Sequence, residues 1–140
     1  MERTDFERVW QRVQGGEDGE AALRREIGEA ERLAAVYGAL AKRWREGERY
    51  RREKEEELRA LRREYYLLTG ERCGADGGRA RGGTLSLLRQ ALIGEERAAE
   101  DYTRRAGSGR TRRERMYGEL GMKAERRAEG IQRAITATMK

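Results

Sequence analysis

The sequence predicts an all-α protein, and three observations indicate this fold class. Proline is absent from the 140 residues, 41% of the residues are charged and only 6% are aromatic. Ala, Leu, Glu and Arg dominate, and they favour helices over strands. Apolar side chains recur three and four residues apart along four long segments, as on one face of an amphipathic helix. With 36% hydrophobic residues each helix has a narrow apolar stripe, so we expect one antiparallel four-helix bundle.

The first predicted elements are a short helix and a long one. Thr4 and Glu7 have the spacing of a capping box. The apolar residues that follow are Phe6, Val9, Trp10 and Val13. Because Gly15 and Gly16 come next, we expect residues 1–20 to form a short docking helix and a turn, and residues 21–140 to form the bundle. The long helix is expected to end near Gly47, and its stripe is Leu23, Ile27, Ala30, Ala34, Tyr37, Ala41 and Trp44.

The second long helix and a long connection follow. The stripe of this helix mixes apolar and charged residues, namely Tyr50, Lys54, Glu57, Leu61, Tyr65 and Leu68. It is expected to end at Thr69 and Gly70, since glycine is a favoured helix terminator. Residues 71–83 contain five glycines and no periodicity, so we expect a long irregular connection.

The last two long helices each begin at a threonine. Thr84 caps the third, whose stripe is Leu85, Leu88, Ala91, Leu92, Glu95, Ala98, Ala99, Tyr102 and Ala106. Thr111 and Glu114 form a second capping-box pattern at the start of the fourth. The stripe of the fourth helix is Tyr117, Gly121, Ala124, Glu125, Ala128, Ile131 and Ile135.

Four charged residues lie on or beside these apolar stripes, and they are Lys54, Glu57, Glu95 and Glu125. Clustered carboxylates repel one another, and a buried lysine without a partner loses its proton. A lysine ammonium among carboxylates offsets their repulsion, and the carboxylates in turn keep the lysine protonated. We therefore expect a buried ion cluster in which the Lys54 ammonium donates to the three carboxylates and fixes the register of the helices. The alternative is a rotation of the second helix by about 100°, which turns Lys54 and Glu57 to water.

The third helix repeats a spacing of the first, because Ala30 precedes Tyr37 by seven residues as Glu95 precedes Tyr102. This pattern resembles the rubrerythrin-type domains of the ferritin-like superfamily, in which two helices place a Glu seven residues before a Tyr and the other two carry Glu-x-x-His. The likeness covers about residues 21–137, in the stretches GEAERLAAVYGALAKR, REKEEELRALRREYYLLTGE, LLRQALIGEERAAEDYTRRA and GELGMKAERRAEGIQRAI.

The resemblance implies a di-iron site whose six ligand positions fall on Ala30, Lys54, Glu57, Glu95, Glu125 and Ala128. Only Glu95 and Glu125 keep the family's residue, and the chain has no histidine. We therefore expect a degenerate site without a cofactor, in which Lys54 supplies the positive charge. If a metal binds, Glu57, Glu95 and Glu125 are its expected ligands, and a shifted register would offer Glu29, Glu31, Glu53 and Glu56 instead. Tyr37 and Tyr102 are expected in the core.

The basic excess is local, because residues 104–115 hold six arginines and one glutamate, which is +5 of the net charge of +6. Arg112 and Arg113 oppose the helix dipole at the start of their helix, so another influence must select them. The candidates for binding an anion are Arg104, Arg105, Arg110, Arg112 and Arg113. We prefer a solvated loop, since the segment lacks the aromatic platform and the groove-reading motif of nucleic-acid binders.

The missing histidine also excludes Ser-His-Asp and Cys-His catalysis. Cys73 is alone and is expected as a free thiol, while no apolar run suits a membrane span and the first ten residues lack a secretion signal, so we expect a cytoplasmic protein. We expect a non-catalytic interaction or scaffold protein that forms a homodimer or binds another protein, with Phe6, Val9 and Trp10 for docking. The alternatives are a rubrerythrin-like peroxidase or oxidoreductase with iron or manganese and, favoured least, an arginine-mediated nucleic-acid binder.

Overall fold

A computed structural model describes residues 3–74 and 78–139, with the backbone alone over residues 3–18. Over these residues the chain forms four helices and no strand, which confirms the predicted all-α class. The helices are α1 (Arg3–Leu40), α2 (Arg45–Thr69), α3 (Thr84–Ala106) and α4 (Arg112–Thr138). Within the described part of the chain, none of the helices is both long and apolar enough to cross a membrane.

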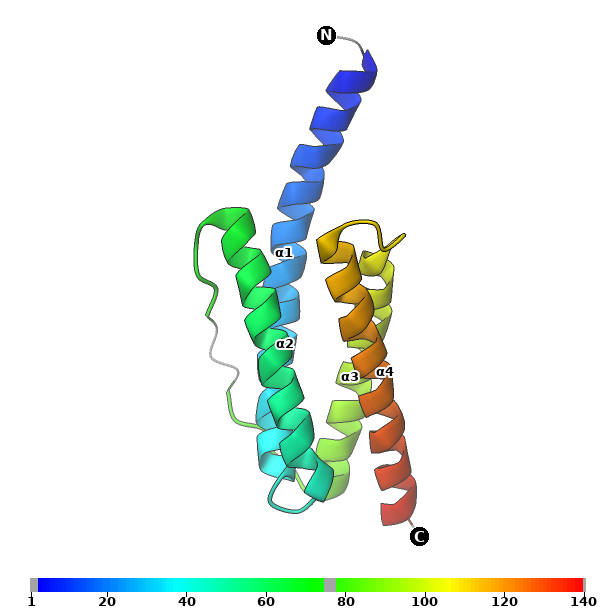
Figure 1. Ribbon diagram of the computed structural model, residues 1–140. Helices are drawn as coiled ribbons and strands as arrows, with labels where there is room; N and C mark the ends of the chain where they lie inside the picture. The colour runs from blue at the N-terminus through cyan, green and yellow to red at the C-terminus, as the bar shows by residue number, and fades with distance from the viewer. Residues whose placement is uncertain (1–2, 75–77, 140) are drawn as a thin grey trace.

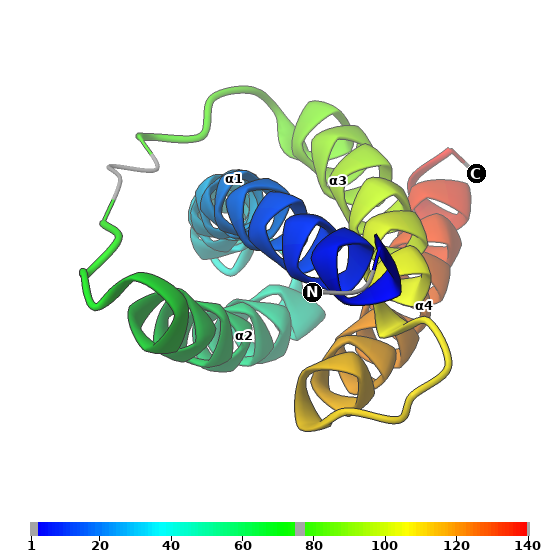
Figure 2. The same cartoon turned by 90° about the horizontal axis from the view of Figure 1, so that it is seen from above.

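The helices are arranged as two pairs (Figures 1 and 2). α1 packs most extensively on α2 and α3 on α4, while α1 with α3 and then α2 with α4 are in looser contact. In Figure 1, α2 and α3 run in the same direction and α1 and α4 run in the opposite one. Within the described residues the backbones of α1 and α4, and those of α2 and α3, do not pack side by side, and these pairs meet only through long side chains. Each helix therefore runs opposite to the helices whose backbones pack against it.

The first helix corrects two predictions. Residues 3–40 form one continuous helix, so the predicted stop at Gly15 and Gly16 is wrong and the expected boundary at residue 20 falls inside α1. A helical glycine costs about 1 kcal/mol relative to alanine but keeps its backbone hydrogen bond, and that cost has not broken the helix. The first turns of α1 project beyond the other helices (Figure 1). The side chains of the predicted docking residues Phe6, Val9 and Trp10 lie outside the described ones.

Gly47 also has a different role from the one predicted. The long helix ends at Leu40 rather than near Gly47, and Gly47 lies buried in the first turn of α2. A Cβ atom at Gly47 would lie 2.8 Å from the backbone nitrogen of Ala41. The glycine therefore allows the close approach of two backbone segments at the α1–α2 turn, where any side chain would collide.

The predicted ends of the other helices are close to the observed ones, but Thr84 does not cap α3. It is the first residue of the helix, and the cap position is Gly83, without a side-chain hydrogen bond. α2 ends at Gly70, which has φ 74° and closes the helix in the left-handed region. At the start of α4 the capping box is present, because the Thr111 hydroxyl accepts from the Glu114 backbone and the Glu114 carboxylate accepts from the Thr111 backbone, both at 3.0 Å. This confirms the predicted connection between α3 and α4.

Apolar side chains form two clusters at different levels of the molecule. One is built around Leu33, Leu40, Tyr50, Leu88 and Ile131, and the other around Leu23, Ile27, Leu61, Tyr102 and Leu120. Along α2, α3 and α4 the residues that separate these clusters are charged, namely Lys54, Glu57, Glu95 and Arg127. The core of the described residues therefore consists of two apolar layers with a polar layer between them.

Candidate functional site

The polar layer is a buried ion cluster to which every helix contributes. α1 supplies Tyr37, α2 supplies Lys54 and Glu57, α3 supplies Glu95 and Tyr102, and α4 supplies Arg127. None of these residues is more than 3% exposed. Ionised side chains are buried at this depth only when they are paired, so the partners of each group decide what the site can do.

Both carboxylate oxygens of Glu95 accept hydrogen bonds. Lys54 Nζ donates to Oε1 at 2.7 Å, and the Tyr37 hydroxyl donates to Oε2 at 2.5 Å. Arg127 Nε also donates to Oε2. Glu95 is therefore held by two cations and a phenol that come from three other helices.

Glu57 has the same kind of surroundings. Its Oε2 accepts from Lys54 Nζ and from the Tyr102 hydroxyl, both at 2.8 Å, and its Oε1 accepts from Arg127 Nη2 at 2.9 Å. Arg127 Nη1 donates in addition to Glu53, at 3.1 Å and at the edge of the core. Lys54 and Arg127 thus each bridge Glu57 and Glu95, and no oxygen of these two carboxylates lacks a donor.

The electrostatics of the site keep its charges fixed. Burial, the largest influence, raises the pKa of Glu95, but the charges and hydrogen bonds of Lys54 and Arg127 outweigh it and hold the pKa below its ordinary value. Burial lowers the pKa of Arg127, yet Glu95 and Glu57 together raise it above its ordinary value. Burial and the neighbouring carboxylates raise the pKa of Tyr37 and of Tyr102, so both phenols stay neutral donors. Two cations against two buried anions leave the cluster neutral.

The structure brings together Lys54, Glu57 and Glu95, which the sequence placed in one cluster, with Tyr37 and Tyr102 beside them in the core. The alternative in which Lys54 and Glu57 turn to water is not the observed one, since these residues are 0% and 3% exposed. Their inward position follows from the stripe of α2, which continues through Leu61 at helical spacing.

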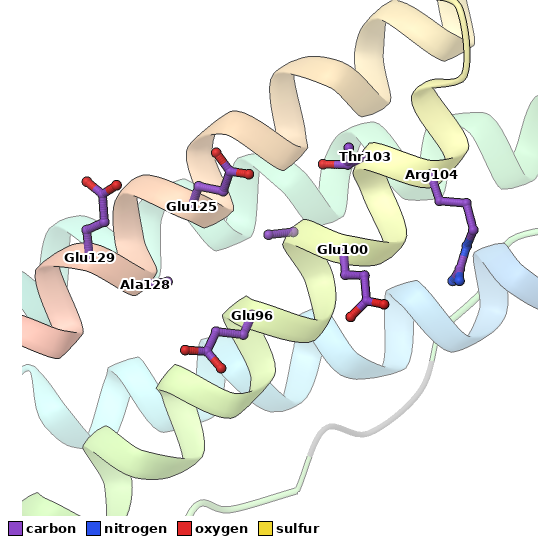
Figure 3. A pocket seen from close by; sticks show the side chains of 8 residues that line it. Glu96, Glu100, Thr103, Arg104, Glu125, Ala128 and Glu129 are labelled. Atoms are coloured by element: carbon purple, nitrogen blue, oxygen red, sulfur yellow. The ribbon is translucent and has the colours of Figure 1, made fainter.

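The placement of Glu125 is wrong. Glu125 is exposed on the outer side of α4, where it lines an open groove with Glu129, Glu96 and Glu100 (Figure 3). Successive helical residues are about 100° apart, so a helix that turns Ala124 and Ile131 inward turns Glu125 out.

Arg127 takes the place expected for Glu125 and was not among the predicted site residues. Because arginine side chains are mostly exposed, residue type alone predicts a solvent-facing position for Arg127. Its spacing carried the signal, because Arg127 follows Ala124 by three residues and precedes Ile131 by four, on the buried stripe of α4.

The other carboxylates considered for a metal do not gather. Glu29 is exposed and pairs with Arg32, Glu31 is buried and accepts from Arg62, and Glu56 is exposed. Among the described side chains, those of residues 19–74 and 78–139, no group of three or more Asp, Glu, His or Cys side chains could hold a metal ion. The carboxylates of the acidic groove in Figure 3 therefore do not form such a group either.

The influence that selects Arg112 and Arg113 is a buried carboxylate. Glu64 of α2 is 1% exposed, and its two oxygens accept from Arg112 Nη1 and, at 3.1 Å, from Arg113 Nε. Burial raises the pKa of Glu64, but the hydrogen bonds from both arginines outweigh burial and lower it. These arginines therefore tie the start of α4 to α2, which accounts for their position against the helix dipole.

Two more of the arginines considered for anion binding have partners within the chain. Arg105 Nε forms an ion pair with buried Glu26 at 2.9 Å, and its Nη2 donates to the Tyr117 hydroxyl, which donates to Glu26 at 2.7 Å. Arg104 pairs with Asp101. Arg110 is exposed, and its backbone takes part in the capping of α4. Three of the six arginines of this hairpin, Arg105, Arg112 and Arg113, thus pair with buried carboxylates.

The buried ion cluster joins four helices and leaves no carboxylate oxygen of Glu57 or Glu95 without a donor from the chain itself. Its chemistry is that of a cross-link made of charge-assisted hydrogen bonds, which fix side-chain geometry strongly. Comparisons of the chain with protein-family models, with curated proteins and with solved structures found no match. The function has to be inferred from the contacts of the chain itself.

Proposed function

We propose that the chain is a cytoplasmic, non-catalytic interaction or scaffold protein, built as an antiparallel four-helix bundle of the ferritin-like, rubrerythrin-like kind whose di-iron site has degenerated. The observation that carries the proposal is that Glu57 and Glu95 each already accept three hydrogen bonds from the chain's own side chains. Each of their oxygens accepts from Lys54, from Arg127 or from a tyrosine. The centre of the molecule is thereby used for holding the helices together.

Several features support the ferritin-like assignment. Neighbouring helices run in opposite directions, and the residues after Thr69 join α2 to the far end of the molecule, where α3 begins (Figure 1). Ala30 of α1 and Glu95 of α3 are both buried, each seven residues before a buried tyrosine. Ferritin-like bundles combine such a long crossover with inward-facing ligands at these levels.

The residues present do not fit a pair of iron ions. A di-iron centre in such a bundle is held by carboxylates and imidazoles that leave positions open for oxygen or peroxide. Ala30 offers no ligand atom, the chain has no histidine, and both buried carboxylates are already occupied. A dication placed between Glu57 and Glu95 would also face the positive charges of Lys54 and Arg127. Binding would have to displace both cations at a large cost in desolvation.

Metal analysis tests this proposal. We expect the purified protein, and the protein incubated with Fe(II) or Mn(II), to retain no stoichiometric metal after gel filtration. Retention of about two ions per chain, lost in Glu57→Gln and Glu95→Gln but kept in the exposed control Glu129→Gln, would support the peroxidase or oxidoreductase alternative instead. Circular dichroism on each variant separates loss of metal from loss of fold.

A further inference from the structure

The outer side of α4 is divided by charge. Lys123, Arg126 and Arg133 are exposed toward α2, and Glu125 and Glu129 are exposed toward α3. The division follows from helical geometry, because at about 100° per residue Arg126 and Arg133 fall on one flank and Glu125 on the other. Met122 is 58% exposed and lies between the two flanks by the same geometry.

The acidic flank borders a groove lined mainly by carboxylates, and the basic flank borders a groove lined mainly by cations. The acidic groove runs along α3 and α4 (Figure 3). Its charged lining residues are Glu96, Glu100, Glu125 and Glu129, with Arg104 toward the end of α3, and its other lining residues are Ala99, Thr103 and Ala128. The basic groove runs along α2 and α4, and its exposed cations are Arg49, Lys123, Arg126 and Arg133. Glu129 borders both grooves. The acidic groove thus carries four acids and one base, Arg104, and the basic groove carries four exposed bases beside Glu53 and Glu129.

Three of the four exposed cations of the basic groove have no partner in the described part of the molecule. Lys123, Arg126 and Arg133 form no hydrogen bond or ion pair with any described residue. Arg49 forms a long ion pair with Glu53, at 3.9 Å, and lies over the ring of Tyr50. The arginines of the 104–115 hairpin differ, since most of them pair with carboxylates of the same chain. The basic groove therefore presents cations whose best partners lie outside the chain.

The four acids of the acidic groove and the four exposed bases of the basic groove also lie at one level of the molecule. On α4 they span residues 123–133. Gly130 lies against Tyr50, which places Arg49 of α2 at this level. Gly121 lies against Thr103, so Glu100 and Glu96 of the oppositely directed α3 lie beside the following turns of α4.

We propose that the partner of this protein is a second copy of the same chain, bound through the outer face of α4 with the acidic groove of each copy on the basic groove of the other. A two-fold axis parallel to α4 produces this match twice. A half-turn about such an axis places the acidic flank of each copy opposite the basic flank of the other, and it does not shift either copy along the helix axis. A two-fold axis perpendicular to α4 would set acid against acid. The two α4 helices therefore lie side by side in the same direction, with Met122 near its copy. This inference rests on the proposed function and names its surface.

A second copy fits this surface better than a nucleic acid does. A phosphate backbone would gain the cations of the basic groove but would meet the carboxylates on the next flank of the same helix. Apart from the buried Arg127, five acids and five bases line the two grooves, and the net positive charge of the chain lies mainly in residues 104–115. Self-complementary charge is what an isologous interface needs.

Charge reversal of the full chain tests the interface. We expect a dimer by sedimentation or light scattering at about 50 mM salt that weakens toward about 1 M, where the screening length falls to roughly 3 Å. Arg126→Glu with Arg133→Glu makes both flanks acidic, and Glu125→Lys with Glu129→Lys makes both basic, so each double variant should be monomeric. Mixing the two variants should restore a heterodimer, because every groove then meets its opposite charge.

The matched control is Arg59→Glu with Arg63→Glu, which reverses two exposed arginines of α2 that line neither groove and should keep the dimer. The proposal fails if the wild-type chain is a monomer at every salt concentration, if the dimer survives both reversals, or if the reversals abolish only binding of a random DNA duplex. These outcomes are separate from metal uptake, which tests the proposed function alone: a dimer that binds iron contradicts that function and leaves the interface standing.

Discussion

Arg127 of α4 donates to Glu95 of α3 in the middle of the molecule, and neither residue is more than 1% exposed. The pair lies across the interface of α3 and α4, which is the most extensive helix–helix contact of the described residues. Lys54 connects Glu95 to α2 as well. Fully buried pairs of this kind contribute little net stability when complete but are costly to break, because the remaining charge is left without a partner.

Replacing Arg127 by methionine should therefore destabilise the protein by about 3–5 kcal/mol. The change removes the donors to Glu95 and Glu57 while keeping most of the side-chain volume. Urea unfolding followed by circular dichroism measures the effect. Arg126→Met, at the exposed neighbouring position, should change stability by no more than about 0.5 kcal/mol. Equal effects from the two substitutions would mean that Arg127 is not buried against these carboxylates.

The pH dependence of stability should carry opposite signs at Glu95 and Glu26. The pKa of Glu95 is lowered from 4.5 in the fold, so the ionised form adds stability above pH 4.5 that is lost as the pH falls through the lowered value. Burial raises the pKa of Glu26, more strongly than the Tyr117 hydrogen bond and Arg105 lower it, so ionisation of Glu26 reduces stability as the pH rises from 4.5 through the raised value.

The corresponding measurement is urea unfolding of the wild type, Glu95→Gln and Glu26→Gln across the acid range. The deficit of Glu95→Gln should be largest near neutral pH and shrink in acid. Relative to the wild type, Glu26→Gln should become more stable as the pH rises above 4.5. Parallel curves for all three proteins would contradict the assigned directions.

Two glycines should respond in opposite ways to alanine. Gly47→Ala should destabilise the protein by about 1–3 kcal/mol, since the new methyl group would overlap the backbone of Ala41. Gly28→Ala in α1 should stabilise it by up to about 1 kcal/mol, because nothing lies within 4 Å of the new atom and alanine is the better helix former. Thermal unfolding of both variants is sufficient, and a stabilising Gly47→Ala would show that the α1–α2 turn is looser than described.

Removing the partners of Glu64 should also be costly. Arg112→Ala combined with Arg113→Ala leaves a buried carboxylate without its donors and should cost about 1–3 kcal/mol, with part of the loss recovered by adding Glu64→Leu. Arg110→Ala is the control, since Arg110 is exposed and should change stability by at most about 0.5 kcal/mol. A solvated loop would give the same small value for all three arginines.

The sequence was informative where periodicity alone decides the outcome. The stripe of α2 placed Lys54 and Glu57 inside, and the capping box placed the start of α4 at Thr111. The prediction was wrong for Glu125 and Arg127, where residue type was given more weight than helical spacing.

Other features depend on tertiary contacts that periodicity does not report. The hydrogen bond between Arg112 and Glu64 joins residues 48 positions apart in the sequence, and no local sequence pattern predicts it. The continuity of α1 through Gly15 and Gly16 is a balance between a small local cost and a helix already anchored further along.

The polar layer has a consequence for the order of assembly. Lys54 and Glu57 pair within α2, and Glu95 and Arg127 pair between α3 and α4, so the α1–α2 hairpin and the α3–α4 hairpin each contain a cation beside an anion. Each half reaches the docking step with its central charge already cancelled, and no lone ion has to leave water when the halves meet. The arrangement favours a folding pathway in which two hairpins form first, from contacts close in sequence, and then join.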